Sequence, residues 1–582
     1  MRTSRLATRL TLAAALCLGA ASLTGCENEN DPATWVGKLS ATNKRPAAMR
    51  RLRQMWESKL ATTTPPNNLR DPAVQAFLNA VLPAVNEAFV DHRDELAVRK
   101  EAIEILAGSG DARAIPALLN ALEFSPGNSE SERIALRAAQ ALKELHPANN
   151  PQVVQRLLAT IDRASGNSGS APAIREAVIQ ALGAIGDRSA VDVLVRTLKK
   201  PIDQQEIRTA RAAADALGLL GDASQPVVDA LIYGLYLNVR RANAFNNCGR
   251  ALTRLGAAAA VVPRLIATVN GQNPEVTLLI NSFASVPGMP PVPPGLQQST
   301  AIDVLRNFAD RSAVPALIAL LTNRETVGNV RGAAAETLGY TGLALPADAP
   351  ERGPIFTALS TVFNEGTPGG EDDMAPTVAP ALVLLGDART VALLVRRIST
   401  REMSAPSAVQ YRLGLLMPLA SAVRHDTFAQ FDTLATTAAA QLAAMVAAQP
   451  DAASEIAPVQ AQLATIRQVA SVAHDCDDGN LACYRERLAS PEKNVVRKAA
   501  YMIAWTGGDN PAARQALLAQ AANPDLLVRR SIHVAIDALS PHGCAECITR
   551  LEQVIEGERG QESKSLLHLE AQMLISRLRG RT

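Results

Sequence analysis

The sequence is poor in aromatic residues and nearly balanced in charge. Trp, Tyr and Phe make up 3% of the 582 residues, and 58 basic side chains stand against 56 acidic ones, a formal net charge of +2. A protein that holds nucleic acid on a basic face and stacks bases on aromatic rings needs more of both. We therefore expect no nucleic-acid partner.

Motifs that mark common active sites are also missing. The sequence has no Gly-rich phosphate loop, no Gly-x-Ser-x-Gly elbow and no His-Glu-x-x-His pair, and none of its seven histidines is followed by Glu. The acidic run Glu371, Asp372 and Asp373 lacks the alternating spacing of a calcium loop, which favours a solvated acidic loop. We expect no catalytic residues, no metal site and no cofactor.

The first 25 residues have the three parts of an export signal. Arg2, Arg5 and Arg9 precede an uncharged apolar stretch over residues 10–23, and small residues lead to Cys26. This order is typical of a secretory signal, and the apolar stretch is too short to span a membrane comfortably. It resembles the bacterial lipoprotein signal, and the resemblance implies cleavage before Cys26 and lipidation of Cys26. The alternative is plain secretion with Cys26 as an ordinary thiol.

Removal of residues 1–25 takes away three arginines, so the formal net charge falls from +2 to −1. Several acyl chains on one cysteine give stable membrane attachment, whereas a single chain is marginal. We expect residues 26–42 to form a polar tether, and no later segment to span the membrane. This predicts a protein of the bacterial cell envelope, lipid-anchored to the inner or outer membrane and mainly facing the periplasm.

Gly-Asp pairs recur along the rest of the chain and indicate an internal repeat. Together with weaker turn signals they are mostly about 32–45 residues apart, which suits a two-helix unit. After several of these pairs, apolar residues follow at i, i+3, i+4 and i+7, the spacing of one helix face. The Gly suits the left-handed end of one helix, and the Asp suits the N-cap of the next. The pairs are Gly110-Asp111, Gly186-Asp187, Gly221-Asp222, Gly386-Asp387 and Gly508-Asp509.

Strings such as the one from Val98 to Leu106, followed by Gly110-Asp111, resemble short bacterial HEAT repeats of the phycobilisome-lyase HEAT-like type. The resemblance implies an all-α fold, an α-solenoid of stacked two-helix HEAT-like repeats over residues 95–560. We expect an N-terminal helical cap over residues 43–94 and a C-terminal capping helix within residues 561–582. The resemblance is specific for architecture and does not carry over a lyase or hydroxylase activity.

Four arginines stand twelve residues before a turn, at Arg99, Arg175, Arg497 and Arg529. They could form a row that faces a ligand. Alternatively, each could pair with carboxylates or carbonyls at a turn of its own or a neighbouring repeat. We favour the structural role because these arginines follow the repeat and do not gather at one site.

Four cysteines near the C-terminus predict two disulfides, because an exported chain meets an oxidising environment. The turns that carry Cys476 and Cys544 are two repeats apart, or about 20 Å, whereas a disulfide needs Cα atoms within about 7 Å. The spacing therefore favours the local pairs Cys476–Cys483 and Cys544–Cys547. Cys248 lies on an apolar helix face and is expected to be a buried free thiol.

Cys544 and Cys547 also permit a second interpretation, because a Cys-x-x-Cys motif that opens a helix has a lowered thiol pKa. The alternative function is an envelope thiol-redox factor. No βαβ pattern surrounds the motif, so we favour a structural disulfide. The main hypothesis is a non-catalytic solenoid that binds or scaffolds another envelope protein.

Overall fold

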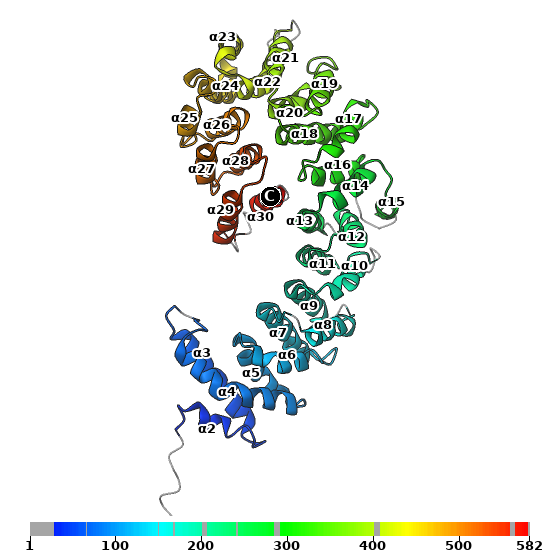
Figure 1. Ribbon diagram of the computed structural model, residues 1–582, viewed down its shortest axis with the longest axis vertical. Coiled ribbons are helices and arrows are strands. Elements are labelled where there is room, and N and C mark those ends of the chain that lie inside the picture. Colours follow the sequence, from blue (N-terminus) through cyan, green and yellow to red (C-terminus); the bar gives the residue numbers. More distant parts are fainter. Residues whose placement is uncertain are drawn as a thin grey trace, which may run out of the picture. The chain divides into compact units, whose positions relative to one another are not determined.

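The computed structural model describes residues 28–579, apart from 66, 149, 167–168, 201–205, 240–241, 284–290, 401–407, 559–560 and 562–564. The expected signal peptide and Cys26 lie outside the described residues. The chain divides into two compact units, unit 1 up to Leu194 and unit 2 from Val195 onward. Both units are built from α-helices (Figure 1).

Unit 1 begins with a short helix and continues as helical hairpins. Its helices are α2 (Pro32–Val36), α3 (Arg45–Ala61), α4 (Pro72–Asp91), α5 (Leu96–Gly108), η1 (Ala112–Ala114), α6 (Ile115–Ala121), α7 (Ser129–Leu145), α8 (Pro151–Arg163), α9 (Ala171–Ile185) and η2 (Arg188–Ala190), with α10 (Val191–Leu198) at the junction of the units. Helix α2 falls inside the segment expected to be a polar tether. Asp31 caps it, and the Trp35 indole donates to the carbonyl of Glu29 at 2.9 Å.

Unit 2 continues the pattern with one small interruption. Two-residue strands β1 (Asn238–Val239) and β2 (Ala242–Asn243) pair antiparallel, Asn238 opposite Asn243 and Val239 opposite Ala242. The helices are α11 (Ile207–Leu220), α12 (Gln225–Leu235), α13 (Phe245–Leu255), α14 (Ala258–Val269), α15 (Pro274–Ser282), α16 (Leu296–Leu305), η4 (Arg311–Ala313), α17 (Val314–Thr322), α18 (Gly328–Ala344), α19 (Arg352–Phe363), α20 (Ala375–Leu385), α21 (Arg389–Ile398), α22 (Val409–Ala422), η7 (His425–Thr427), α23 (Phe428–Ala448), η8 (Pro450–Ala452), α24 (Ala453–Asp475), α25 (Leu481–Arg487), α26 (Lys493–Thr506), α27 (Pro511–Ala519), α28 (Leu526–Ala538), α29 (Ala545–Gly557) and α30 (Ser565–Arg579).

The helices of each unit form two layers, as a solenoid requires. In unit 1 the first helices of successive hairpins, α5, α7 and α9, pack on one another, and the second helices α6 and α8 pack against the first helix that follows. In unit 2 the even-numbered helices from α16 to α30 form the corresponding row of first helices. Each hairpin shares its apolar face with its neighbours, so the core runs along the stack. The predicted all-α solenoid of two-helix HEAT-like repeats is confirmed.

The Gly-Asp turns join the two helices of a repeat as predicted. Gly186 has φ +81° at the end of α9, and the Asp187 carboxylate accepts a 2.8 Å hydrogen bond from the backbone N–H of Ser189. Gly110, Gly221 and Gly386 also have positive φ, and the aspartates that follow accept from the backbone two residues on. At Gly508 the prediction is wrong by one residue, because Asn510 and not Asp509 caps the next helix.

Buried arginines hold each repeat to the turn before it. The Arg331 Nε donates to the carbonyl of Leu321 at 2.8 Å, and the Arg529 guanidinium donates to the carbonyls of Ala522 and Asn523. These carbonyls lie at or just beyond the C-terminal end of a second helix, where unpaired carbonyls and the helix dipole favour a cation. Arg99 and Arg175 donate to carbonyls in the same way, which is the expected structural role.

Arg497 does not follow this pattern, whereas its neighbour Lys498 is buried and makes a different contact. The exposed fraction of Lys498 is 1%, and its ammonium donates to the carbonyls of Ser421 and Val423, both at 2.6 Å. These carbonyls end α22. Lys498 thus reaches a first helix and not the turn before its own repeat, so the prediction for Arg497 is wrong, and Arg497 lies at a groove described below.

The row of helices in unit 2 closes on itself. Helix α30 packs on α28 and α29, and it also packs on α13 (Figure 1). The Ser576 hydroxyl donates to the carbonyl of Thr253, and Arg577 donates to the carbonyl of Asn307 at 2.6 Å. The helix within the expected C-terminal cap thus reaches the beginning of its own unit.

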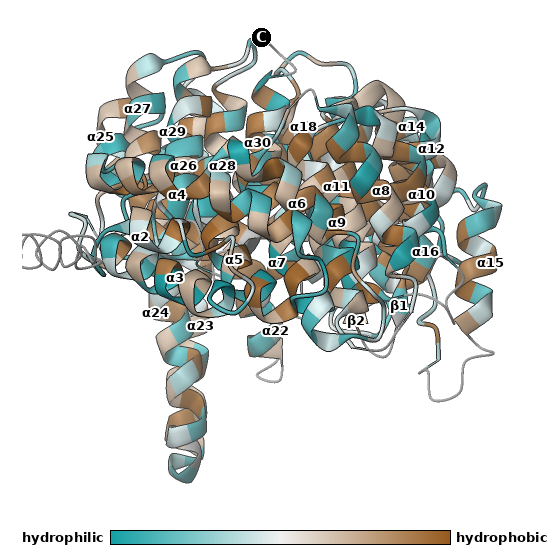
Figure 2. Cartoon of the chain, turned by 90° about the horizontal axis from the view of Figure 1, so that it is seen from below, coloured by the Kyte–Doolittle hydropathy of each residue, from teal (hydrophilic) through white to brown (hydrophobic). Residues whose placement is uncertain are grey.

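Two described helices are long and apolar enough to cross a membrane, judged by length and composition alone. Helix α4 buries eight apolar side chains, among them Phe77, Leu82 and Phe89, as a core helix does. The segment from His425 to Ala448 is mostly exposed and belongs to the α23–α24 hairpin, which extends away from the rest of unit 2 (Figure 2). The absence of a later transmembrane segment stays a prediction.

Candidate functional site

A groove of about 1000 Å³ runs along first-layer helices of unit 2. It is lined by residues from α18, α20, α22, α26 and α28, which are far apart in sequence and are brought together by the closure of the unit. We call this hollow the inner groove. Its position on first helices means that several repeats of unit 2 build it together.

Glycines on α18 allow one wall of the inner groove to form without gaps. A Cβ atom at Gly339 would lie 2.8 Å from the Cα of Ala381, and one at Gly332 would lie 3.0 Å from the Thr377 side chain. At Gly339 only a residue without a side chain fits this approach of two helix backbones, and at Gly332 the Thr377 side chain would have to move. Helices α18 and α20 therefore pack closely behind the groove.

The surface of the inner groove is partly apolar. Pro376 and Pro380 of α20 are exposed, Met417 of α22 is half-buried, and Leu527 of α28 is 41% exposed. A contiguous exposed apolar surface framed by polar groups is typical of a protein-binding surface. The groove thus offers contacts for another protein chain.

Aromatic and aliphatic residues join opposite walls of unit 2. Leu343 of α18, Leu384 of α20 and Val534 of α28 form a small buried cluster, against which Tyr501 and Trp505 of α26 pack. The Tyr501 and Trp505 rings are stacked with centroids 6.0 Å apart. This cluster fixes α18 next to α28 and so stabilises the shape of the groove.

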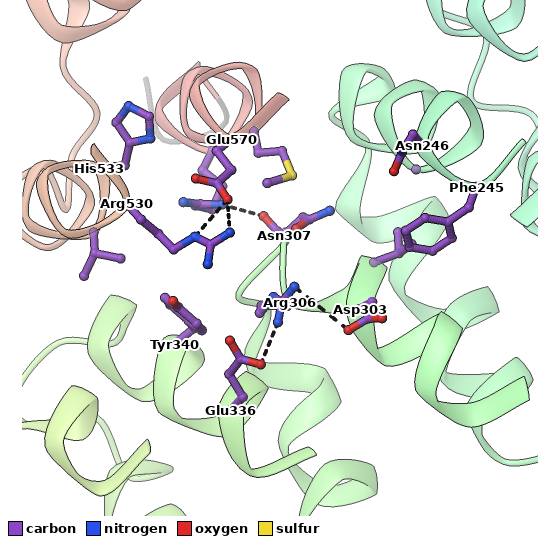
Figure 3. A pocket seen from close by; sticks show the side chains of 15 residues that line it. Phe245, Asn246, Asp303, Arg306, Asn307, Glu336, Tyr340, Arg530, His533 and Glu570 are labelled. Carbon is purple, nitrogen blue, oxygen red and sulfur yellow. Dashed lines mark hydrogen bonds and ion pairs between the residues drawn. The ribbon is translucent and has the colours of Figure 1, made fainter. Parts of the chain in front are cut away.

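A second hollow of about 190 Å³ lies where α30 meets α13, α16, α18 and α28, and we call it the α30 pocket (Figure 3). Glu336, Tyr340 and Arg530 line both the α30 pocket and the inner groove. The two hollows are therefore neighbours that share one wall.

Ion pairs hold the charged groups of the α30 pocket in place. Arg530 donates to Oε1 of Glu570 from Nε at 2.9 Å and from its terminal nitrogen at 2.5 Å, and Arg306 lies 2.8 Å from Glu336 (Figure 3). Arg577 behind them donates to Asp537 at 2.9 Å. These pairs come from four different helices or their ends, so they also tie the closure together.

Burial sets the protonation of two further groups in the α30 pocket. Loss of water, aided by nearby arginines, lowers the pKa of His533 to about 3, so its imidazole is neutral at pH 7. Burial also raises the pKa of Asp303, because Arg306 at 3.9 Å only partly offsets the loss of water. Both nitrogens of His533 lack a hydrogen-bond partner among the described residues.

The acidic run at residues 371–373 is used within the fold. The Asp373 carboxylate accepts hydrogen bonds from the backbone N–H groups of Gly369 and Ala375, both at 2.8 Å, and pairs with Arg397 at 3.1 Å. The Tyr411 hydroxyl also donates to it. These contacts order the loop before α20 at the edge of the inner groove and do not form a cation site.

The cysteines lie where the sequence places them. The sulfurs of Cys476 and Cys483 are at bonding distance with Cα atoms 5.7 Å apart, and those of Cys544 and Cys547 likewise with Cα atoms 5.2 Å apart. Cys248 is a fully buried free thiol, and burial raises its pKa. This agrees with the expected buried free thiol.

The Cys544–Cys547 pair does not have the geometry of an accessible redox centre. Cys544 is 7% exposed and Cys547 is fully buried, whereas a reactive cysteine must meet a partner thiol at the surface. In the described part of the chain, one group of three residues lies close enough together to hold a metal ion, and it consists of Cys544, Glu546 and Cys547. The two sulfurs of this group are joined to each other in a disulfide.

Sequence reasoning missed the inner groove and the α30 pocket. Arg530, His533 and Asp537 stand at i, i+3 and i+7 on α28, a polar face in an otherwise buried helix. That spacing is a detectable signal. The partners Glu336 and Glu570 are too far away in the chain to be linked to it without the closure of unit 2.

Comparison with known protein families identifies the repeat in two stretches of unit 1 and its junction with unit 2. Residues 98–124 and 174–200 match the PBS lyase HEAT-like repeat. Each matched stretch runs from a first helix through a Gly-Asp turn into a second helix, α5 to α6 and α9 to α10. No curated protein matches the sequence.

Several solved structures are similar in fold at low identity. Human deoxyhypusine hydroxylase in complex with glycerol is 18% identical with a TM-score of 0.21, over 54% of this chain and 99% of that chain. Kap121p is 13% identical with a TM-score of 0.23, over 93% and 74%. A structure of Kap95p bound to RanGDP is 12% identical with a TM-score of 0.33, over 91% and 67%. These likenesses concern the fold alone.

Proposed function

We propose that this chain is a lipid-anchored scaffold of a bacterial cell envelope that binds another envelope protein in the inner groove of unit 2. The proposal joins two independent features, the lipoprotein-like N-terminus ending at Cys26 and the solenoid surface. Catalysis has no part in it.

The observation that carries the binding role is the composition of the inner groove. Exposed prolines, half-buried Met417 and exposed Leu527 lie beside charged residues such as Glu371 and Arg497. A surface that combines apolar and charged groups is found in protein interfaces, and a groove along several helices suits an extended segment. Because several first helices line the groove, a partner can bind in it without the movement of a loop.

Lipidation of Cys26 would tether the chain that carries the groove to the membrane. Residues 28–31 are exposed or half-exposed and precede the short helix α2, so only a few residues separate Cys26 from the folded chain. The partner would therefore be another protein at the membrane surface or one that reaches it, and the membrane contact would be through the acyl chains.

Site-specific photocrosslinking in a bacterial cell tests the binding role. A photoreactive residue at Leu527 or Gly414 in the groove is expected to capture one and the same protein. The matched control places the same photoreactive residue at Leu278, which is 69% exposed on α15 and does not line the groove. Capture of the same protein from Leu278, or of no protein from the groove positions, would contradict the proposal.

The anchor is tested separately on the chain with its own leader. Mass spectrometry of the N-terminal peptide is expected to show a diacylated or triacylated Cys26. The variant C26S should lose the acyl chains and leave the membrane fraction while unit 1 and unit 2 stay folded. An unmodified Cys26 thiol in the mature chain would rule out lipidation.

A further inference from the structure

We propose that the α30 pocket binds one organic cation, the ammonium or guanidinium group of a Lys or Arg side chain that the partner in the inner groove inserts. This inference rests on the proposed binding role and specifies the chemistry that the partner must present.

The charged groups in and directly behind the α30 pocket include one carboxylate more than guanidinium groups. The described charged groups that line the pocket, or pair with a residue that does, are four carboxylates and three guanidinium groups, and the His533 imidazole is neutral. The carboxylates belong to Asp303, Glu336, Asp537 and Glu570, and the guanidinium groups to Arg306, Arg530 and Arg577. The lining itself is balanced, and the fourth carboxylate, Asp537, stands behind it in a pair with Arg577, so the pocket and its immediate surroundings hold one carboxylate more than guanidinium groups.

Unsatisfied buried atoms in the same pocket call for a hydrogen-bond donor. Oε2 of Glu570 is buried without a partner among the described residues, although Oε1 accepts from Arg530. His533 is 5% exposed, and its two nitrogens also lack partners in the described chain. A buried acceptor without a donor costs free energy, which a ligand N–H group would recover. A neutral imidazole additionally offers a lone pair to such a donor.

The dimensions and walls favour a side chain over a metal ion. Glu570 and His533 do not belong to any group of three described ligand residues close enough to hold a metal. The volume of about 190 Å³ suits one long side chain, and Phe245, Val304 and Met573 provide apolar walls. The methylene groups of Lys or Arg pack on such walls while the charged end meets the carboxylates.

The position of the pocket explains how a partner reaches it. Glu336, Tyr340 and Arg530 belong to both hollows, so a chain that lies in the inner groove passes beside the α30 pocket. One basic side chain could then enter the pocket while the backbone stays in the groove. Specificity for the partner would come from the register of that side chain.

Binding of three small probes to the full mature chain tests the inference by calorimetry. We expect N-acetyl-arginine amide to bind about tenfold more tightly than N-acetyl-citrulline amide, its neutral isostere, because a charged hydrogen bond is lost. Agmatine, the third probe, represents a free amine that does not belong to a protein. Equal binding of the arginine and citrulline probes, or binding of neither, would overturn the inference, and tighter binding of agmatine would overturn its assignment to a partner side chain.

Two variants locate the probe. E570Q and D303N should each weaken the binding of N-acetyl-arginine amide about tenfold. The Asp303 carboxylate lies 3.9 Å from Arg306, beyond hydrogen-bond distance, so D303N breaks no hydrogen bond between these two residues. The matched control E552Q changes an exposed carboxylate of α29 and should leave binding unchanged. Equal affinity of E570Q, D303N and E552Q for N-acetyl-arginine amide would overturn the assignment of the site.

The two proposals can fail separately. If photocrosslinks form in the inner groove but the probes do not bind, only this inference fails. If the probes bind but no crosslink forms, the proposed function fails.

Discussion

The Ser576 hydroxyl donates a 3.0 Å hydrogen bond to the carbonyl oxygen of Thr253, a residue 323 positions earlier in the chain. Few contacts in a stacked-repeat protein are so distant in sequence, because each repeat normally touches only its neighbours. The contact shows that α30 is held from two sides, and the closure that it marks has measurable consequences.

The first prediction concerns Arg577, which pairs with buried Asp537 and donates to the carbonyl of Asn307. R577A should lower the free energy of unfolding of unit 2 by about 3 kcal/mol, because the buried Asp537 carboxylate loses its ion pair with Arg577. Urea unfolding followed by circular dichroism measures the change. The control R579A removes an exposed pair with Glu552 and should change stability by less than about 0.5 kcal/mol. Equal effects of the two variants would contradict the importance of the closure.

The second prediction compares two arginines that share one carboxylate. Arg331 lies 2.8 Å from Glu365 with 9% of its side chain exposed, whereas Arg324 lies 3.5 Å from it with 75% exposed. R331A should cost about 2–3 kcal/mol, because it leaves the carbonyl of Leu321 without this donor and leaves the Glu365 carboxylate with only the more distant, exposed Arg324. R324A should cost at most about 0.5 kcal/mol in the same denaturation experiment. If R324A lowers the free energy of unfolding as much as R331A does, burial of the arginine does not determine the loss of stability.

The third prediction is a rise of stability with pH that depends on Lys498. Burial lowers the pKa of Lys498 from 10.5 in the unfolded chain to about 7 in the folded one. Between these values the unfolded chain binds a proton that the folded chain does not, so the free energy of unfolding increases as pH rises. From pH 7 to pH 9 the contribution is on the order of 2 kcal/mol. K498M should lack this rise in urea titrations at the two pH values, and an unchanged rise would contradict the assignment.

The fourth prediction is a loss of stability in acid that depends on His533. Its folded pKa of about 3 lies below the unfolded value of 6.5, so the stabilisation is complete above pH 6.5 and is lost as pH falls toward 3. Between pH 6.5 and pH 5 the loss is on the order of 2 kcal/mol. H533L should show a correspondingly smaller loss in thermal or urea unfolding. H474Q, which alters an exposed histidine, is the control and should behave as the unaltered chain does.

The fifth prediction concerns the cysteine pairs. Alkylation without reduction, followed by peptide mass spectrometry, should find Cys476 joined to Cys483 and Cys544 joined to Cys547. Cys248 should react only after unfolding, because it is fully buried. A crosslink between the two turns, or alkylation of Cys544 in the folded chain, would contradict the local pairing and its burial.

The sequence was sufficient for features that depend on neighbouring residues. The left-handed Gly186 and the capping Asp187 follow from the local chemistry of a helix end, and the buried role of Arg529 follows from its place in the repeat. The failure of the prediction at Arg497 has a local reason. Arg99, Arg331 and Arg529 each stand four residues after the N-cap of their helix, whereas Arg497 stands five after Glu492.

The candidate site lay beyond the reach of the sequence for a geometric reason. Each hairpin adds a small rotation, and only the sum over many hairpins decides whether α30 meets α13. A change of a few degrees in each repeat would separate Arg577 from Asn307 and remove the α30 pocket. The periodicity that predicts a solenoid therefore does not predict that this part of it closes, or that Glu570 lies opposite Arg530.

The closure also determines how unit 2 can come apart. In an open stack the last hairpin can peel away after one interface breaks, and the next can follow. Helix α30 packs between α28 and α29 on one side and α13 on the other. Unfolding from the carboxyl end must therefore also break contacts with residues more than three hundred positions earlier in the chain. Under a mechanical load or beside a processive protease, unit 2 would resist up to a threshold and then give way over a long stretch of chain in one event.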